Sequence, residues 1–289
     1  MSIYNDQRCA SYKQANTYNM SNAPIGVFDS GIGGLSVYLH LAQQLPNEHY
    51  LYYADTLHVP YGDREGKEIE KLTLTAIEWL YNKGCKLIVI ACNSASAHAL
   101  QVARERYPQV PMVGLVPALK PAVFASHSGQ VAILATKATL EGSLLNQVIT
   151  EIALPNNTTV IKYFDPELVP WVESGMPDDS QTATRLRQQL QQLADENIDY
   201  LVLGCTHYPF FKEFLLQEIR EQQLSITVVD SGQAIATRVQ SLLKDKKMLA
   251  FRNDNEKNPL FFYASKYDDK LGRLVQRLVG EQVEIQYIS

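Results

Sequence analysis

Two of the four cysteines in this 289-residue chain share one local setting. Cys92 and Cys205 each follow a run of apolar residues, in the stretches KLIVIACNSA and DYLVLGCTHY, and each precedes a short polar stretch. A helix that began there would lower the pKa of the thiol from about 8.5, because a helix N-terminus carries partial positive charge. The pattern therefore predicts two reactive thiols, whereas Cys85 is expected in the core and Cys9 lies in an N-terminal leader with no role assigned.

A pair of reactive thiols could perform three kinds of chemistry. One thiolate could remove a proton from carbon while a second thiol returns a proton to the opposite face, which inverts that carbon. Two-base transfer is favoured because thiols titrate near working pH and are easily desolvated in a closed site. A redox disulfide and a metal pair remain open alternatives.

The stretch VFDSGIGGLS, residues 27–36, nearly matches a dinucleotide-binding fingerprint. Ser36 stands where the third glycine would be, and Asp55 follows at about the spacing of a ribose-binding acid. Asp29, at the tip of the strand, would repel a pyrophosphate but can bind or steer an ammonium group. Its alternative role is to cap the helix that follows.

Apolar runs and helical patterns alternate along the chain, which predicts α/β architecture. The runs are continuous, as in parallel sheets covered on both faces. Helices are predicted over 67–84, closed by Gly84, and over 182–198. The predicted strands include 25–28, 49–54, 86–91, 110–116, 130–136, 158–164, 199–204 and 225–230.

The strand ends repeat in order. Residues 25–36 resemble 131–142, residues 86–95 resemble 199–208, and residues 112–118 resemble 227–233. This repeat predicts two pseudo-symmetric α/β domains, each with a mostly parallel sheet flanked by helices, with the active site in the cleft between them. The expected division is a flexible leader 1–23, a first domain 24–116 plus 228–289, and a second domain 117–227.

Composition narrows the class of partner. The net charge of −5 and the pI of about 5.7 make nucleic acid or an anionic membrane an unlikely main partner. No apolar run approaches the ~18 residues of a membrane span, and residues 1–23 lack the apolar core of a signal peptide. The cysteines have neither disulfide density nor zinc-site spacing. We therefore expect a cytoplasmic protein that acts on a small molecule.

An ordered set of motifs resembles the glutamate racemases of the aspartate/glutamate racemase superfamily over residues 24–289. The motifs are FDSGIGG, VPYGD, ACNSAS, LVPALKPA, ILATKAT, LVPWVESG, LGCTHYP and the DSG at 230–232. The resemblance implies a cofactor-independent, metal-free glutamate racemase that supplies D-glutamate for peptidoglycan. It also implies that Cys92 serves the α-proton of D-glutamate and Cys205 that of L-glutamate.

The resemblance implies roles for further residues. Asp29 and His207 would be catalytic as well as substrate-binding, and Glu173 would lie in a second layer beside His207. One anion and many neutral donors suit glutamate, which carries one ammonium and two carboxylates. The remaining implied substrate contacts are Ser30, Tyr61, Gly62, Asn93, Ser94, Thr136, Thr139 and Thr206.

Three positions depart from the family pattern, and other functions remain open. Ser94 replaces a usual threonine, Ala138 a usual glycine and Asp165 a usual cysteine.

A homodimer is expected, and some family members with such a leader respond to a nucleotide-linked cell-wall precursor. The competing hypotheses are an aspartate racemase or decarboxylase of the superfamily, and a non-enzymatic dinucleotide-binding or redox-sensing module.

Overall fold

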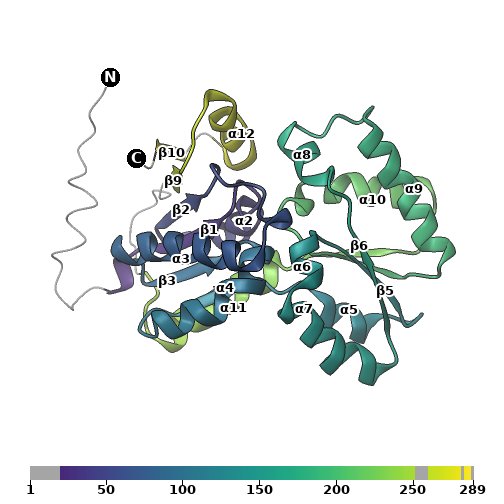
Figure 1. Ribbon diagram of the computed structural model, residues 1–289, viewed down its shortest axis with the longest axis horizontal. Helices are drawn as coiled ribbons and strands as arrows, with labels where there is room; N and C mark the ends of the chain where they lie inside the picture. Colours follow the sequence, from purple (N-terminus) through teal and green to yellow (C-terminus); the bar gives the residue numbers. More distant parts are fainter. Residues whose placement is uncertain (1–19, 251–259, 281–282, 288–289) are drawn as a thin grey trace.

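The computed structural model describes residues 20–250, 260–280 and 283–287. It contains two parallel sheets flanked by helices, in two lobes (Figure 1). Most of the expected leader, with Cys9, lies outside the described residues. Within them, no helix is long and apolar enough to cross a membrane.

The first sheet has six parallel strands in the order β10-β9-β2-β1-β3-β4. The second has four parallel strands in the order β6-β5-β7-β8. The bounds are β1 (Ile25–Asp29), β2 (Tyr50–Ala54), β3 (Leu87–Ile90), β4 (Met112–Gly114), β5 (Gln130–Leu134), β6 (Thr159–Tyr163), β7 (Tyr200–Leu203), β8 (Thr227–Val229), β9 (Leu260–Ala264) and β10 (Val283–Tyr287).

The strand orders confirm the internal repeat. The strands β1, β2, β3 and β4 correspond to β5, β6, β7 and β8. In both sheets the corresponding strands lie in the same order, β2-β1-β3-β4 in the first and β6-β5-β7-β8 in the second. Cys92 follows β3 and Cys205 follows β7, so the two cysteines occupy equivalent places. β9 and β10 extend the first sheet beyond β2, and the second sheet has no counterpart to them among its described strands.

Helices cover both lobes, and both predicted helices form. Gly84, with φ of +78°, follows the first of them, as expected for a helix-ending glycine. The first lobe contains α2 (Leu35–Gln44), α3 (Gly66–Asn82), α4 (Asn93–Arg106), α11 (Gly232–Asp245) and α12 (Asp269–Val279), with the short turns η1 (Met20–Asn22) and η2 (Tyr61–Asp63). The second contains α5 (Leu119–Ala125), α6 (Lys137–Glu141), α7 (Ser143–Val148), η3 (Ile149–Ala153), η4 (Leu154–Asn156), α8 (Leu168–Glu173), α9 (Gln181–Asp195), η5 (Tyr208–Phe211) and α10 (Lys212–Glu221).

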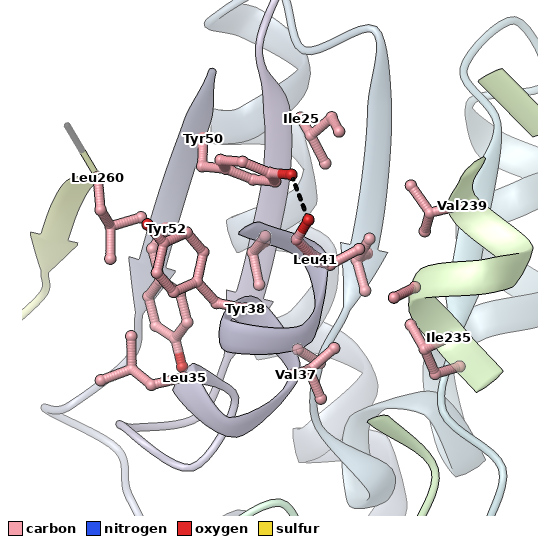
Figure 2. Close-up of a cluster of buried hydrophobic side chains, with 14 of the residues drawn as sticks. Ile25, Leu35, Val37, Tyr38, Leu41, Tyr50, Tyr52, Ile235, Val239 and Leu260 are labelled. Carbon is pink, nitrogen blue, oxygen red and sulfur yellow. Dashed lines mark hydrogen bonds between the residues drawn. The ribbon is translucent and has the colours of Figure 1, made fainter. Parts of the chain in front are cut away.

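The continuous apolar strands are buried because helices pack on both faces of each sheet. On one face of the first sheet, Ile25 of β1 and Tyr52 of β2 pack with side chains of α2 and α11 (Figure 2). The Tyr50 hydroxyl donates to the Leu41 carbonyl oxygen at 3.0 Å, so this large side chain is buried with its polar atom satisfied. Cys85 lies in the core on the other face, as expected.

The chain crosses between the sheets after β4 and again after β8. The Ser231 hydroxyl of the second crossing donates to the Val116 carbonyl oxygen of the first at 2.8 Å, so the two crossings lie side by side. The expected division set the return at residue 228. However, β8 pairs with β7, which moves the return to the residues after Val229.

A buried ion pair lies at the other end of the first sheet. Lys86 Nζ and Glu48 Oε2 are 2.5 Å apart, and both side chains are almost fully buried. Lys86 Nζ also donates to the carbonyl oxygens of Ser21 and Met248, and Ala250 N–H donates to Glu48 Oε1. Burial lowers the pKa of Lys86, while the charge and hydrogen bond of Glu48 oppose that shift. The pair thereby joins four segments of the chain, at residues 21, 48, 86 and 248–250.

Candidate active site

Asp29 is the last residue of β1, and its side chain is 0% exposed. Its carboxylate accepts a hydrogen bond from Gly31 N–H at 3.0 Å and from the Thr206 hydroxyl at 3.4 Å. Burial raises the pKa of Asp29, while the charge of His207 and nearby backbone N–H groups oppose that rise. The N-cap of α2 is Gly34, so Asp29 is not the cap of that helix.

Cys92 is the N-cap residue of α4, and its sulfur accepts from Ala95 N–H at 3.5 Å. The expected helix start is present, but the expected fall in the pKa of Cys92 is not. Burial and the negative charge of Asp29 raise this pKa, and they outweigh the opposing effects of the hydrogen bonds that Cys92 forms with Ala95 N–H and with the Ser30 hydroxyl. The Ser30 hydroxyl oxygen lies 3.7 Å from the sulfur. Cys92 is therefore held as a thiol.

Cys205 has a different setting. It follows β7 but precedes η5, a 3-10 turn, and α10 begins only at Lys212. The expectation of a helix N-terminus directly after Cys205 is therefore wrong. Pro209, within the first two residues of η5, has no N–H group and cannot donate in the first turn of a helix. The neighbour of the Cys205 sulfur is His207, whose Nδ1 lies 3.9 Å away.

His207 links Cys205 to Glu173. Its Nε2 lies 3.2 Å from Glu173 Oε1, at the end of α8, and the ring is buried. Burial lowers the pKa of His207, but its hydrogen bonds to Cys205 and Glu173 and their negative charges raise it to about 10. At neutral pH the ring is therefore a cation that can donate to both partners. Such a cation stabilises negative charge on the Cys205 sulfur.

The expected hydroxyl and amide donors meet where the two lobes touch. Ser94, on α4, lies 2.9 Å from the Thr136 hydroxyl oxygen and 3.5 Å from that of Thr139. Thr136 caps α6 by accepting from Thr139 N–H. Asn93 Nδ2 is buried without a hydrogen-bond partner among the described residues. An unsatisfied amide donor of this kind is suited to an anionic ligand.

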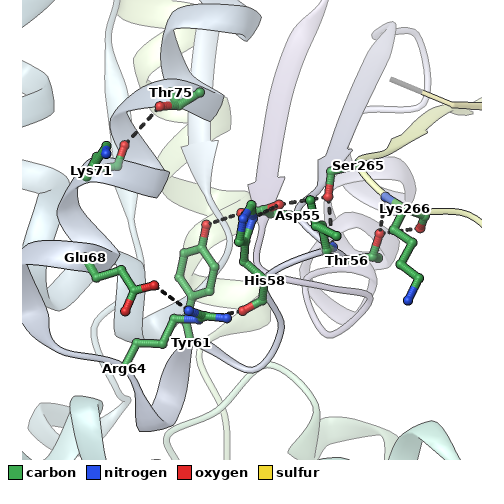
Figure 3. Close-up of polar contacts among 11 residues, drawn as sticks. Asp55, Thr56, His58, Tyr61, Arg64, Glu68, Lys71, Thr75, Ser265 and Lys266 are labelled. Atoms are coloured by element: carbon green, nitrogen blue, oxygen red, sulfur yellow. Dashed lines mark hydrogen bonds and ion pairs between the residues drawn. The ribbon is translucent and has the colours of Figure 1, made fainter. Parts of the chain in front are cut away.

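Tyr61 and Gly62 reach the same boundary from the loop after β2. A β-carbon on Gly62 would lie 2.8 Å from Thr136 Cβ, so this close approach requires glycine. The Tyr61 hydroxyl donates to Asp55 Oδ2 at 2.6 Å, and Figure 3 shows His58 and Ser265 bonded to the same carboxylate. Asp55 therefore holds this loop in place through hydrogen bonds. Its spacing in the sequence had resembled that of a ribose-binding acid, which is a different role.

Charge interactions relate these groups across the two sheets. Burial is the main cause of the raised pKa of Cys92, the charge of Asp29 adds to it, and a thiolate at Cys205 adds a smaller amount. Beside Cys205, a pocket of about 20 Å³ is also lined by Asn93, Thr206 and Ser36. This volume has room for about one water molecule.

The arrangement favours acid–base chemistry between unlike thiols. Cys92 is held protonated, while Cys205 lies beside a cationic histidine, so one thiol can donate a proton while the other accepts one. Cys85, Cys92 and Cys205 are all free thiols. Within residues 20–250, 260–280 and 283–287, no group of three or more His, Cys, Asp or Glu side chains is arranged to hold a metal ion.

Known proteins are similar to this chain in sequence and in fold. The profile of the family described as Asp/Glu/Hydantoin racemase matches residues 25–239. The glutamate racemase of Deinococcus radiodurans is 48% identical over 223 residues, which are 77% of this chain and 76% of that protein.

Two solved structures with ligands are also similar. Glutamate racemase from Francisella tularensis in complex with D-glutamate has a TM-score of 0.79 and 28% identity, covering 93% of this chain and 98% of that one. Glutamate racemase from Escherichia coli, in complex with L-glutamate and the activator UDP-MurNAc-Ala, has a TM-score of 0.77 and 30% identity, covering 92% and 98%.

Proposed function

Because the chain belongs to the Asp/Glu/hydantoin racemase family, we propose that it is a glutamate racemase that works through two cysteines. The observation that carries this proposal is the unlike surroundings of two equivalent cysteines. The pKa of Cys92 is raised, which keeps a proton on its sulfur. Cys205 faces His207, whose pKa is about 10, so that the cationic ring can donate a hydrogen bond to the sulfur. Each turnover of a two-base racemase needs one thiol and one thiolate.

Substrate would lie between the carboxyl ends of the two sheets. Asp29 is the anion that binds or steers the substrate ammonium, and it gains a partner for its buried charge by doing so. The carboxylates would accept from the Asn93 amide and from the hydroxyls of Ser94, Thr136 and Thr206. The substrate ammonium also reduces the unfavourable effect of Asp29 on a Cys92 thiolate, because the two charges then offset each other.

Proton transfer would follow from this placement. When L-glutamate is bound, the Cys205 thiolate removes the α-proton and the Cys92 thiol protonates the opposite face. His207 donates to Cys205 while it is anionic, and Glu173 holds the ring in the cationic form. The reverse reaction begins with Cys92 as the base and ends with a proton returned from Cys205.

The test is circular dichroism of purified protein with L-glutamate, without added metal or pyridoxal phosphate. We expect the optical signal to decay to zero, and the D-glutamate formed early in heavy water should carry deuterium at Cα. L-aspartate is the comparison substrate. Racemisation of aspartate but not glutamate would overturn the substrate assignment, and activity that required metal or pyridoxal phosphate would overturn the mechanism.

The wider proposals follow the same family resemblance. We propose that the product serves peptidoglycan synthesis in the cytoplasm, where reducing conditions preserve free thiols. The two domains would be 24–116 with 230–289, and 117–229, in a homodimeric enzyme. The complex of the Escherichia coli protein with UDP-MurNAc-Ala supports regulation by a nucleotide-linked precursor. A change in the racemisation rate with this compound would test that regulation.

A further inference from the structure

The loop within residues 27–36, which resembles a dinucleotide-binding fingerprint, packs closely against Thr206 and His207, the residues that follow Cys205. A β-carbon on Gly33 would lie 2.5 Å from both His207 Nδ1 and the Thr206 hydroxyl oxygen, so only glycine allows this approach. Thr206 also donates to Asp29 at the start of the loop. The first lobe therefore contacts the segment that carries Cys205 and its histidine at more than one point.

Ser36 adds a contact of a different kind. It is the second residue of α2, its side chain is 7% exposed, and its Oγ lies 2.8 Å from the Thr206 carbonyl oxygen. The same Oγ lies 2.8 Å from the Gly33 carbonyl oxygen, but a hydroxyl has one hydrogen to donate. Gly33 O already accepts Ser36 N–H at 3.0 Å. We therefore assign the hydrogen bond of the Ser36 hydroxyl to the Thr206 carbonyl oxygen.

The Thr206 carbonyl needs a donor from elsewhere. In a 3-10 turn this oxygen would accept from the N–H three residues later, and that residue is Pro209, which has none. The carbonyls on either side are satisfied in the expected way, since Cys205 O accepts from Tyr208 N–H and His207 O accepts from Phe210 N–H. The Ser36 hydroxyl thus replaces the donor that proline removes.

We propose that Ser36 is a positioning residue for the Cys205 half of the reaction. By holding the Thr206 carbonyl, it fixes the peptide that joins Thr206 to His207, and so fixes the imidazole against the Cys205 sulfur. Ser36 lines the pocket beside Cys205, whereas Cys92 is held by Ala95 N–H and by Ser30. The proposal rests on the glutamate racemase function and adds a residue that acts on one thiol only.

The test compares Ser36→Ala with the wild type by primary deuterium isotope effects on kcat/KM. With α-deuterated L-glutamate the effect reports proton removal by Cys205, and with α-deuterated D-glutamate it reports removal by Cys92. We expect kcat/KM to fall by about 3- to 10-fold, as for the loss of one buried hydrogen bond. The value of kcat/KM must fall by the same factor for L-glutamate and for D-glutamate. The ratio of the two values is the equilibrium constant, which is fixed because the enantiomers have equal free energy in water.

The result that distinguishes a positioning role is that the two isotope effects change in opposite directions. When the Cys205 step becomes the slower one, the isotope effect rises with deuterated L-glutamate and falls with deuterated D-glutamate. Partial unfolding would lower the number of active molecules and leave both isotope effects unchanged. Ser36→Thr keeps the hydroxyl and should restore both values. If Ser36→Ala yields little folded protein, Ser36→Gly removes the same hydroxyl, and the isotope ratios of its active fraction give the same test.

Ser96→Ala is the matched control. Ser96 is a buried serine whose hydroxyl donates to Ile90 O and accepts from Leu115 N–H, so its hydrogen bonds stay within the first lobe. We expect this variant to be less stable but to keep both isotope effects. Symmetric isotope effects in Ser36→Ala, or the same asymmetry in Ser96→Ala, would overturn the inference. A wild type that does not racemise glutamate would instead overturn the proposed function.

Discussion

Replacing Glu173 with Gln should lower the pKa of His207 without changing the shape of the site. Glu173 Oε1 lies 3.2 Å from His207 Nε2, and an opposite charge at such a distance shifts a pKa by about 1–3 units. The Glu173 side chain is 35% exposed, so water screens its charge and the lower end of that range applies. We therefore expect the pKa of His207 to fall from about 10 by about one unit, equivalent to about 1.4 kcal/mol.

The consequence is a shift of the alkaline limb of the pH profile. Loss of the proton from His207 removes the cation beside Cys205, so the rate from L-glutamate should decline about one pH unit earlier in Glu173→Gln. At pH 7 the ring stays protonated, and kcat should change by less than about 3-fold. Circular dichroism measures the rate between pH 6 and 11, and NMR of labelled histidine reports the pKa of His207 directly.

Glu167→Gln provides the control. Glu167 is the N-cap residue of α8 and is exposed, whereas Glu173 lies at the opposite end of the same helix. The control variant should keep the alkaline limb of the wild type. An unshifted limb in Glu173→Gln would refute the electrostatic coupling. A loss of more than about 100-fold at pH 7 would show that Glu173 does more than tune the histidine.

Four further results are expected. Asp29→Asn should lower kcat by at least about 10-fold in steady-state assays, because a neutral amide cannot offset the substrate ammonium. Cys92→Ser and Cys205→Ser should each abolish racemisation in both directions, as chiral chromatography would show, since a hydroxyl is a far weaker acid than a thiol. The contribution of His207 to the free energy of unfolding should be complete below pH 6.5 and decline as the pH rises to about 10, because folding raises its pKa; denaturant titrations of wild type and His207→Asn measure the difference. Lys86→Met should lower the free energy of unfolding by about 3–5 kcal/mol in the same titrations, because it removes the cation that lies beside the buried Glu48 carboxylate, and kcat should stay within about 2-fold.

Strand periodicity and the repeat predicted most of the fold. Continuous apolar runs such as residues 86–91 can only be buried on both faces, which requires a parallel sheet covered by helices. Matching residues 86–95 with 199–208 placed Cys92 and Cys205 after equivalent strands, as the strand orders confirm. β9 and β10 were not among the strands named from the sequence, because they fall outside the repeated unit.

The site was harder to predict, because its electrostatics depend on burial and on single backbone groups. The position of Cys92 before a helix was correct, but the direction of its pKa shift was not, since desolvation and Asp29 outweigh one N–H group. After Cys205, a 3-10 turn that contains Pro209 stands where the sequence predicted the start of an α-helix. Ser36 was interpreted as a missing glycine, although its contact with Thr206 joins residues 170 positions apart and has no local sequence signal.

The place of β9 in the first sheet determines the order in which a growing chain can complete its fold. All four strands of the second sheet lie between residues 130 and 229, so that sheet can form as soon as they leave the ribosome. The outer edge of β2, with the sequence YLYYA, pairs only with Leu260–Ala264 and stays open until those residues are made. An open, apolar strand edge is a template for aggregation. A nascent chain released before residue 260 would expose that tyrosine-rich edge, so the synthesis of β9 determines whether the edge of β2 is covered.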